Sequence, residues 1–125
     1  PPSMTFAISH SLLYPERGAC VCEPLDFTKA VSIDFAPPDT DRFPCLRHAY
    51  NALKKGGTAT AVFNASNEVA VAEFIKGRLP WIKIADVIEK TLDAVETKDP
   101  QTLDDILADD ALARIRAAEI IAAMA

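Results

Sequence analysis

Apolar residues recur with helical spacing through the second two-thirds of the chain, and this pattern predicts a small helical bundle. The first stripe consists of Leu46, Ala49, Tyr50 and Leu53, which follow the i, i+3, i+4, i+7 spacing of a one-faced amphipathic helix. Pro44 suits the first turn of this helix, and Gly56 suits its end.

Residues 59–76 form the second predicted helix, which is apolar nearly all round and ends at Gly77. Three of its polar residues, Asn64, Asn67 and Glu68, have i, i+3, i+4 spacing, which places them on one face. Such groups need hydrogen-bond partners if they are buried. Three interpretations follow: a structural network with a neighbouring segment, which we favour, a contribution to a ligand site, or plain exposure to solvent.

The third predicted helix has the cleanest stripe, and the fourth is predicted in two pieces. The third stripe consists of Ile84, Val87, Ile88, Leu92 and Val95. Thr102 and Asp105 have the spacing of a capping box, which opens a short helical turn. Asp109 or Asp110 then caps a fresh start, with an alanine-rich helix over residues 111–124.

The first 38 residues follow a different pattern. A short helix is predicted over residues 5–14, where Pro15 stops it. Apolar residues alternate with polar ones over Val31–Phe35, the period of a half-buried strand. One strand is not stable alone, and the rest of the chain supplies no partner sheet. We therefore expect Val31–Phe35 to pair with a strand outside residues 1–125.

Together these elements predict a mainly α fold in two parts. Residues 39–125 form a small four-helix bundle domain with short loops. Residues 1–38 form a linker with one strand that belongs to a sheet outside this chain. The chain opens at Pro1 without a methionine, and we interpret it as a piece of a longer protein.

Charge is unevenly distributed, and its distribution excludes two classes of partner. The net charge is -5, but residues 86–110 hold nine acids against Lys90 and Lys98, a balance of -7 that leaves the rest at +2. An acidic face does not suit nucleic acid, whose phosphates need Lys and Arg, or an anionic membrane surface. No apolar run approaches the ~20 residues of a membrane span, and no signal peptide is visible.

No residue pattern indicates a catalytic or metal centre. His10 and His48 lie on predicted helices without a clear carboxylate or cysteine partner. Cys20, Cys22 and Cys45 complete no ligand cluster, and we interpret them as reduced thiols. The acids of residues 86–110 are interpreted as a solvated surface.

Several short motifs follow one another in an order that is more specific than any one of them. They are Pro2-Ser-Met4, Tyr14-Pro15, Pro24-Leu-Asp-Phe-Thr-Lys29, Ile33-Asp-Phe35, Pro38-Asp39 with Arg42-Phe-Pro-Cys-Leu46, and Asn64-Ala-Ser-Asn-Glu68 followed by Val-Ala-Val-Ala-Glu-Phe74. This set covers the whole chain and resembles the 1-deoxy-D-xylulose 5-phosphate reductoisomerase family. The resemblance implies that residues 1–38 end an α/β catalytic domain and form a linker, and that residues 39–125 are the C-terminal helical domain.

The resemblance also implies an activity for the full enzyme. Such enzymes convert 1-deoxy-D-xylulose 5-phosphate to 2-C-methyl-D-erythritol 4-phosphate in non-mevalonate isoprenoid biosynthesis. The full enzyme uses NADPH as the hydride source and Mg²⁺ or Mn²⁺ to polarise the substrate oxygens. The family's metal-binding acids fall before Pro1, so no metal ligand and no catalytic residue is assigned here. We expect this fragment alone to bind neither cofactor and to be inactive.

Two positions are implied to touch the cofactor pocket. Met4 matches a family methionine that lies beside the nicotinamide end of NADPH, and Pro2 matches a proline at the edge of the same pocket. Both would be packing roles. Ser3 stands where many relatives have Asp, which is a local departure from the family pattern.

Two hypotheses for the function follow. In the first, the fragment braces the catalytic domain of its own enzyme, with Asn64, Asn67 and Glu68 as an interdomain structural network. Its partners are the remaining domains, the sugar-phosphate substrate and a second subunit in a homodimer, with no nucleic acid and no membrane. The location is then cytoplasmic in a bacterium, or a plastid in a plant or alga. In the second, the chain is a stand-alone helical interaction module without catalysis.

Overall fold

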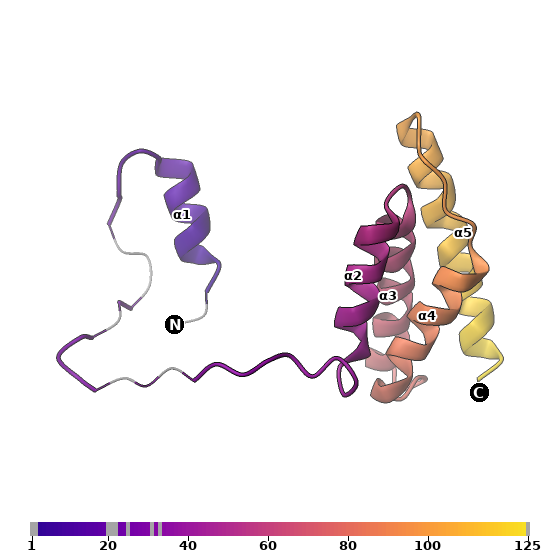
Figure 1. Cartoon of the computed structure of the whole chain (residues 1–125), viewed down its shortest axis with the longest axis horizontal. Helices are drawn as coiled ribbons and strands as arrows, with labels where there is room; N and C mark the ends of the chain where they lie inside the picture. Colours follow the sequence, from indigo (N-terminus) through magenta and orange to yellow (C-terminus); the bar gives the residue numbers. More distant parts are fainter. Residues whose placement is uncertain (1–2, 20–22, 25, 31, 33, 125) are drawn as a thin grey trace. The chain divides into compact units, whose positions relative to one another are not determined.

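The computed structural model describes residues 3–19, 23–24, 26–30, 32 and 34–124. It divides into two compact units, Pro1–Ala36 and Pro37–Ala125. The described residues form five α-helices, one short 3-10 helix and no strand, so the mainly α prediction is confirmed (Figure 1).

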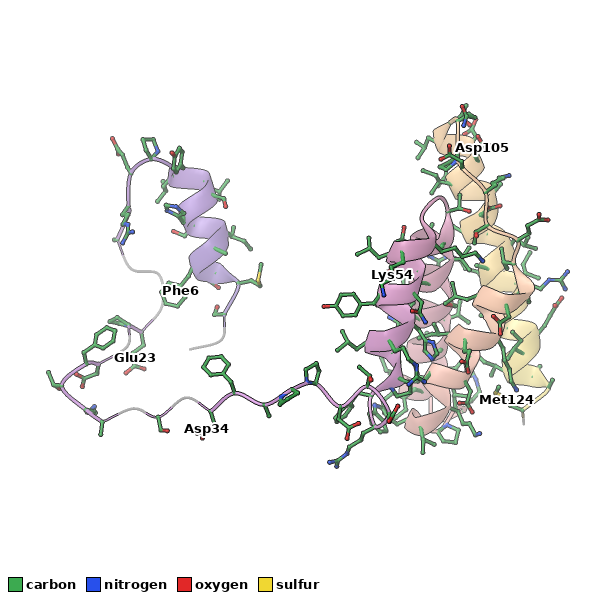
Figure 2. The ribbon with its side chains drawn as sticks, in the orientation of Figure 1. Phe6, Glu23, Asp34, Lys54, Asp105 and Met124 are labelled. Carbon is green, nitrogen blue, oxygen red and sulfur yellow. The ribbon has the colours of Figure 1, made fainter. Side chains whose placement is uncertain are left out.

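Among its described residues, unit 1 contains a single helix, α1 (Thr5–Leu13), close to the range expected from the sequence. None of the residues of α1 is buried, and Figure 2 shows side chains such as Phe6 projecting from it. The predicted strand is only partly covered, because Val31 and Ile33 lie outside the described residues. Ser32 and Phe35 are described, are exposed and carry no strand pairing, so pairing with an outside strand stays a prediction.

Unit 2 is a bundle of four long helices, with short connections that place successive helices side by side (Figure 1). The elements are α2 (Pro44–Lys55), α3 (Ala59–Ile75), the 3-10 helix η1 (Trp81–Lys83), α4 (Ile84–Ala94) and α5 (Leu103–Ala122). Helix α3 packs against each of the other three long helices. Pro at the start of α2 and Gly56 at its end limit that helix as the sequence predicts.

The core of unit 2 combines branched side chains from α4 with alanines from α3 and α5. Its larger cluster consists of Ala70, Leu79, Ile84, Val87, Ile88, Ala117 and Ile121, and its smaller cluster of Val62, Ala65, Val95 and Ala113. The alanines on α3 and α5 allow the two helix backbones to approach closely, so the branched side chains of α4 can fill the space beside them.

Helix α5 is one continuous element, so the predicted fresh start at Asp109 or Asp110 is wrong. The carboxylate of Asp109 is buried and accepts a hydrogen bond from Thr58, at the start of α3, and not from the backbone of its own helix. The predicted capping box is confirmed, because Thr102 and Asp105 each accept a backbone N–H bond from the other residue.

Helix α2 turns its apolar stripe outward. Leu46, Tyr50 and Leu53 are exposed, whereas the residues that α2 buries in the bundle are His48 and Ala52. The sequence period identifies an apolar face, but it does not show which face of the helix the bundle covers.

Candidate functional sites

Two of the three polar residues predicted to share a face of α3, Asn64 and Glu68, form a network with Arg114 on α5. Arg114 on α5 donates from Nη2 to Glu68 Oε2 at 2.7 Å, and Asn64 donates to Glu68 Oε1 at 3.1 Å. Arg114 also donates from Nε to Asp110 at 2.7 Å. The hydrogen bonds from Arg114 and Asn64 hold the pKa of Glu68 below its ordinary value. The network therefore connects α3 to α5 as an ionised surface contact.

Asn67 lies on a groove in unit 2. The groove has a volume of about 720 Å³ and is lined by Asp41, Arg42, Phe43, Pro44, Cys45, Asn67, Val71, Trp81, Ile82, Ile84, Ala85 and Asp86. Its lining is mostly apolar, and Asn67 is half-buried there. Cys45 is half-buried as well, and burial raises the pKa of its thiol, which disfavours the reactive thiolate.

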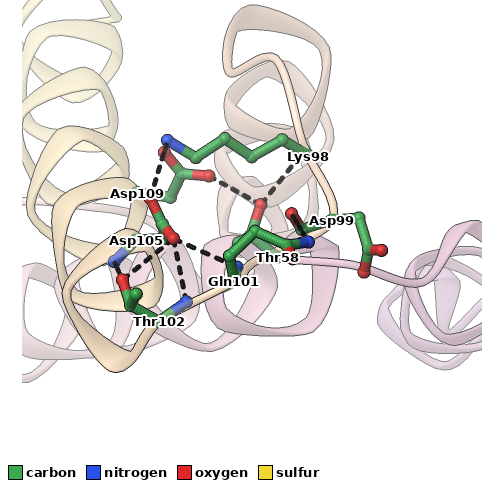
Figure 3. Close-up of polar contacts among 7 residues, drawn as sticks. All are labelled: Thr58, Lys98, Asp99, Gln101, Thr102, Asp105 and Asp109. Carbon is green, nitrogen blue, oxygen red and sulfur yellow. Dashed lines mark hydrogen bonds and ion pairs between the residues drawn. The ribbon is translucent and has the colours of Figure 1, made fainter.

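A third polar cluster joins the start of α3 to the middle of α5 (Figure 3). The buried hydroxyl of Thr58 donates to Asp109 at 2.6 Å and accepts from the backbone N–H of Lys98 at 3.2 Å. The backbone N–H of Thr58 donates to the carbonyl of Lys98 at 2.9 Å. The ammonium of Lys98 lies 3.7 Å from Asp109 and 3.8 Å from Asp105.

The sequence alone does not predict that these residues contact one another. It predicts Asp109 and Asp105 as helix-starting residues, but nothing in the local pattern links them to Thr58, which is 51 residues before Asp109. Each buried polar atom there has a partner, so the cluster is suited to fixing two helices and one loop, not to binding a ligand.

The predicted cofactor residues lie in unit 1. Met4 precedes α1 and is 71% exposed, so its thioether is open to a partner. The neighbouring hydroxyl of Ser3 accepts a hydrogen bond from the backbone N–H of Thr5 at 3.2 Å. Pro2 lies outside the described residues.

The remaining candidate residues are dispersed. His10 makes an edge contact with the Tyr14 ring, with centroids 5.9 Å apart, and His48 is buried in the bundle. Cys20 and Cys22 lie outside the described residues. In the part of the chain that the structure describes, no three His, Cys, Asp or Glu side chains gather as a metal site would require. None of the described helices is long and apolar enough to cross a membrane.

Comparison with known proteins decides the family. The profile of the DXP reductoisomerase C-terminal domain matches residues 1–116. The chain belongs to the DXP reductoisomerase family. Over its matched length it is 46% identical to the 1-deoxy-D-xylulose 5-phosphate reductoisomerase of Nitrosospira multiformis and 47% identical to that of Burkholderia multivorans. Those alignments cover 99% and 97% of this chain, but only 31% and 30% of the relatives.

Solved reductoisomerase structures are similar to this chain. The enzyme of Zymomonas mobilis in complex with NADPH matches 97% of this chain with a TM-score of 0.86 and 43% identity. A DOX-P reductoisomerase in complex with NADPH, fosmidomycin and magnesium matches 98% with a TM-score of 0.88 and 32% identity. In both cases the match covers 32% of the longer protein, so this reductoisomerase chain spans about a third of its relatives.

Proposed function

We propose that this chain is the C-terminal portion of an NADPH-dependent enzyme that converts 1-deoxy-D-xylulose 5-phosphate to 2-C-methyl-D-erythritol 4-phosphate in non-mevalonate isoprenoid biosynthesis. The observation that carries the proposal is the family match over residues 1–116, which runs through both units. The other two-thirds of the polypeptide then form the remaining domains. The named relatives are bacterial, which supports a bacterial cytoplasmic location over a plastid.

The cofactors belong to the remainder of the enzyme. Solved relatives were crystallised with NADPH and magnesium. Following the family resemblance, we propose that the acids that bind Mg²⁺ or Mn²⁺ precede Pro1. NADPH supplies the hydride when bound, and this chain contributes only a wall of its pocket.

Met4 is the residue that forms this wall, with Pro2 at its edge. The exposure of Met4 supports the role, because a flexible and polarisable thioether packs well against a flat ring. Replacing Met4 with Ala in the full enzyme should raise KM for NADPH, and Met4→Leu should restore most of the lost affinity. An unchanged KM in both variants would argue against the contact.

The rest of the chain braces the catalytic domain. A nine-residue helix such as α1 is marginal in water without tertiary packing. The exposure of all its apolar residues therefore supports docking on a larger body, as the end of the catalytic domain over residues 1–38 requires. Val31–Phe35 then adds one strand to the sheet of that domain.

Asn64, Asn67 and Glu68 are proposed to contribute to the joint between the bundle and that domain. Asn64 and Glu68 stay exposed after forming their contacts with each other and with Arg114, which leaves acceptor and donor atoms available to a neighbour. Asn67 is half-buried at the groove. Glu68→Ala should then lower the melting temperature of the full enzyme and leave turnover unchanged.

The experiment joins this chain to the first two-thirds of the Zymomonas mobilis relative, in place of the matching C-terminal third. The hybrid, the free chain and the truncated relative are each given NADPH, the sugar phosphate and Mg²⁺. We expect NADPH oxidation by the hybrid alone. Turnover by the free 125-residue chain would contradict the assignment of chemistry to the remainder. A folded but inactive hybrid would favour the alternative, a stand-alone helical interaction module.

A further inference from the structure

The outer face of α2, defined here as Leu46, Tyr50 and Leu53, is an apolar surface that the bundle leaves open. The three side chains are 38%, 56% and 66% exposed. Their i, i+4, i+7 spacing places them in one row along the helix. His48 and Ala52, which face the bundle, lie on the opposite side of α2. An exposed apolar row of this kind is a candidate interaction surface.

The surroundings of this face define the chemistry of its partner. Helix α2 contains no acidic residue, and it carries Arg47, Lys54 and Lys55. Arg47 and Lys54 lie on one flank of the apolar row, since they fall at i+1 and i+8 from Leu46. Asp41 is an ion-pair partner of Arg47, at 3.1 Å. Because Asp41 already neutralises Arg47, Lys54 is the charge on this flank that a partner meets. A complementary partner is therefore apolar at its centre and carries an acid near Lys54.

We propose that the outer face of α2 docks on the part of the same enzyme that lies outside residues 1–125. This inference rests on the proposed function. About two-thirds of each matched relative has no counterpart in this chain, so a large body is left to cover the face. Residues 37–43 alone separate α2 from unit 1 in sequence. A partner that is continuous with unit 1 is therefore tethered near α2, which raises its effective concentration there.

A second copy of this chain is a poorer occupant. In a symmetric dimer formed through α2, the basic flank of α2 in each subunit would lie against α2 of the other subunit. In an antiparallel contact, Lys54 of each copy would then lie beside the basic flank of the other, where Asp41 neutralises only Arg47. Like charges so placed are destabilising, whereas an acid on the catalytic part would neutralise Lys54.

Hydroxyl-radical footprinting tests the docking directly. The hybrid enzyme and the free chain are exposed to radicals, and the modification rates of Tyr50 and Leu53 are compared by mass spectrometry. Docking should lower both rates about fivefold in the hybrid, since the centre of an interface excludes solvent. Ile115 and Leu107 on α5, which are 57% and 55% exposed, serve as matched controls and should keep their rates. Equal rates for Tyr50 in both proteins would overturn the proposal.

Variants give a second measurement. The triple variant Leu46→Gln/Tyr50→Gln/Leu53→Gln in the hybrid should make residues 37–43 more sensitive to protease, because the bundle no longer docks. The matched variant Leu107→Gln/Ile115→Gln should leave the cleavage rate unchanged. If the cleavage rate is the same in the triple variant and in the parent, docking through α2 is contradicted.

The outcomes separate this inference from the proposed function. A hybrid that turns over while Tyr50 stays exposed overturns the docking surface and leaves the proposed function standing. An inactive hybrid with Tyr50 protected supports docking and contradicts the activity. If Tyr50 in the free chain becomes protected as the chain concentration rises, a second copy is the occupant and the proposal is wrong.

Discussion

The hydroxyl of Thr58, just before α3, donates a 2.6 Å hydrogen bond to the carboxylate of Asp109, in the middle of α5. Both residues are buried. Lys98 completes the contact, since its backbone N–H donates to the same hydroxyl and its ammonium lies 3.7 Å from Asp109. One hydroxyl thus connects two helices and the loop between α4 and α5 (Figure 3).

Removing this carboxylate should destabilise the bundle. Asp109→Ala leaves the Thr58 hydroxyl without its acceptor and the Lys98 ammonium without its nearer carboxylate, which should cost about 2 kcal/mol. Urea unfolding followed by circular dichroism measures the loss. Asp93→Ala, an exposed acid on α4, is the control and should change the free energy of unfolding by less than about 0.5 kcal/mol. Equal effects of the two substitutions would show that the buried contact does not stabilise the fold.

Gly57 is held in place by the same loop. Its φ is +56°, and a Cβ at this position would overlap the Lys98 carbonyl oxygen, the acceptor of the Thr58 N–H. Gly57→Ala should therefore cost about 3 kcal/mol, from left-handed strain and from displacement of that carbonyl. Gly77 has a φ of +72° with open space around it, so Gly77→Ala should cost only about 1 kcal/mol of strain.

Thermal or urea unfolding of both variants checks the difference. A Gly57→Ala variant no less stable than Gly77→Ala would mean that the loop moves away without loss of its hydrogen bond. The comparison isolates the close approach of the loop, because both glycines have a positive φ and both follow a helix.

The sequence predicts the helices well where end signals are local. Pro44 and Gly56 mark α2, and the Thr102–Asp105 capping box marks the start of α5. The continuity of α5 could not be predicted, because the partner that draws Asp109 into the bundle is far away in sequence. For Glu68 the pattern suggested a partner, but its identity as Arg114 depends on how α3 packs on α5.

The outward orientation of the apolar face of α2 could not be predicted from the sequence either. Amphipathic spacing shows that a helix has an apolar face, and the usual inference is that the domain core covers it. Here the smaller Ala52 and the polar His48 face the bundle, and Leu53 faces outward. The docking of α2 that we propose would account for this outward orientation of Leu53.

Thr102 provides a third test, at the start of α5. Its hydroxyl accepts the backbone N–H of Asp105, and Asp105 accepts the backbone N–H of Thr102 in return. Thr102→Ala should lower the free energy of unfolding by about 1 kcal/mol, because one helix-end N–H loses its acceptor. Thr102→Ser keeps the hydroxyl and should recover most of the loss. If Ser and Ala are equally destabilising, the methyl group and not the cap is responsible.

Glu73 gives a test of pH dependence at the other end of α3. Arg78 donates two hydrogen bonds to its carboxylate, one of them from Nη2 at 2.7 Å, and Lys76 donates a third at 3.2 Å. These bonds, that of Arg78 foremost, lower the pKa of Glu73 to about 2 from an ordinary 4.5. The folded state therefore holds the proton less tightly than the unfolded state, and stability falls as the carboxylate is protonated.

Comparison of the parent with Glu73→Gln should reveal this contribution. Above pH 4.5 the parent should have the higher melting temperature, and the difference should narrow as the pH falls from 4.5 toward 2. Arg78→Met should flatten the same part of the curve, because it removes the main donor. Glu89→Gln, on the exposed side of α4, should leave the shape of the curve unchanged. A parent–variant difference that stays constant between pH 4.5 and 2 would show that Arg78 does not hold Glu73 in the folded protein.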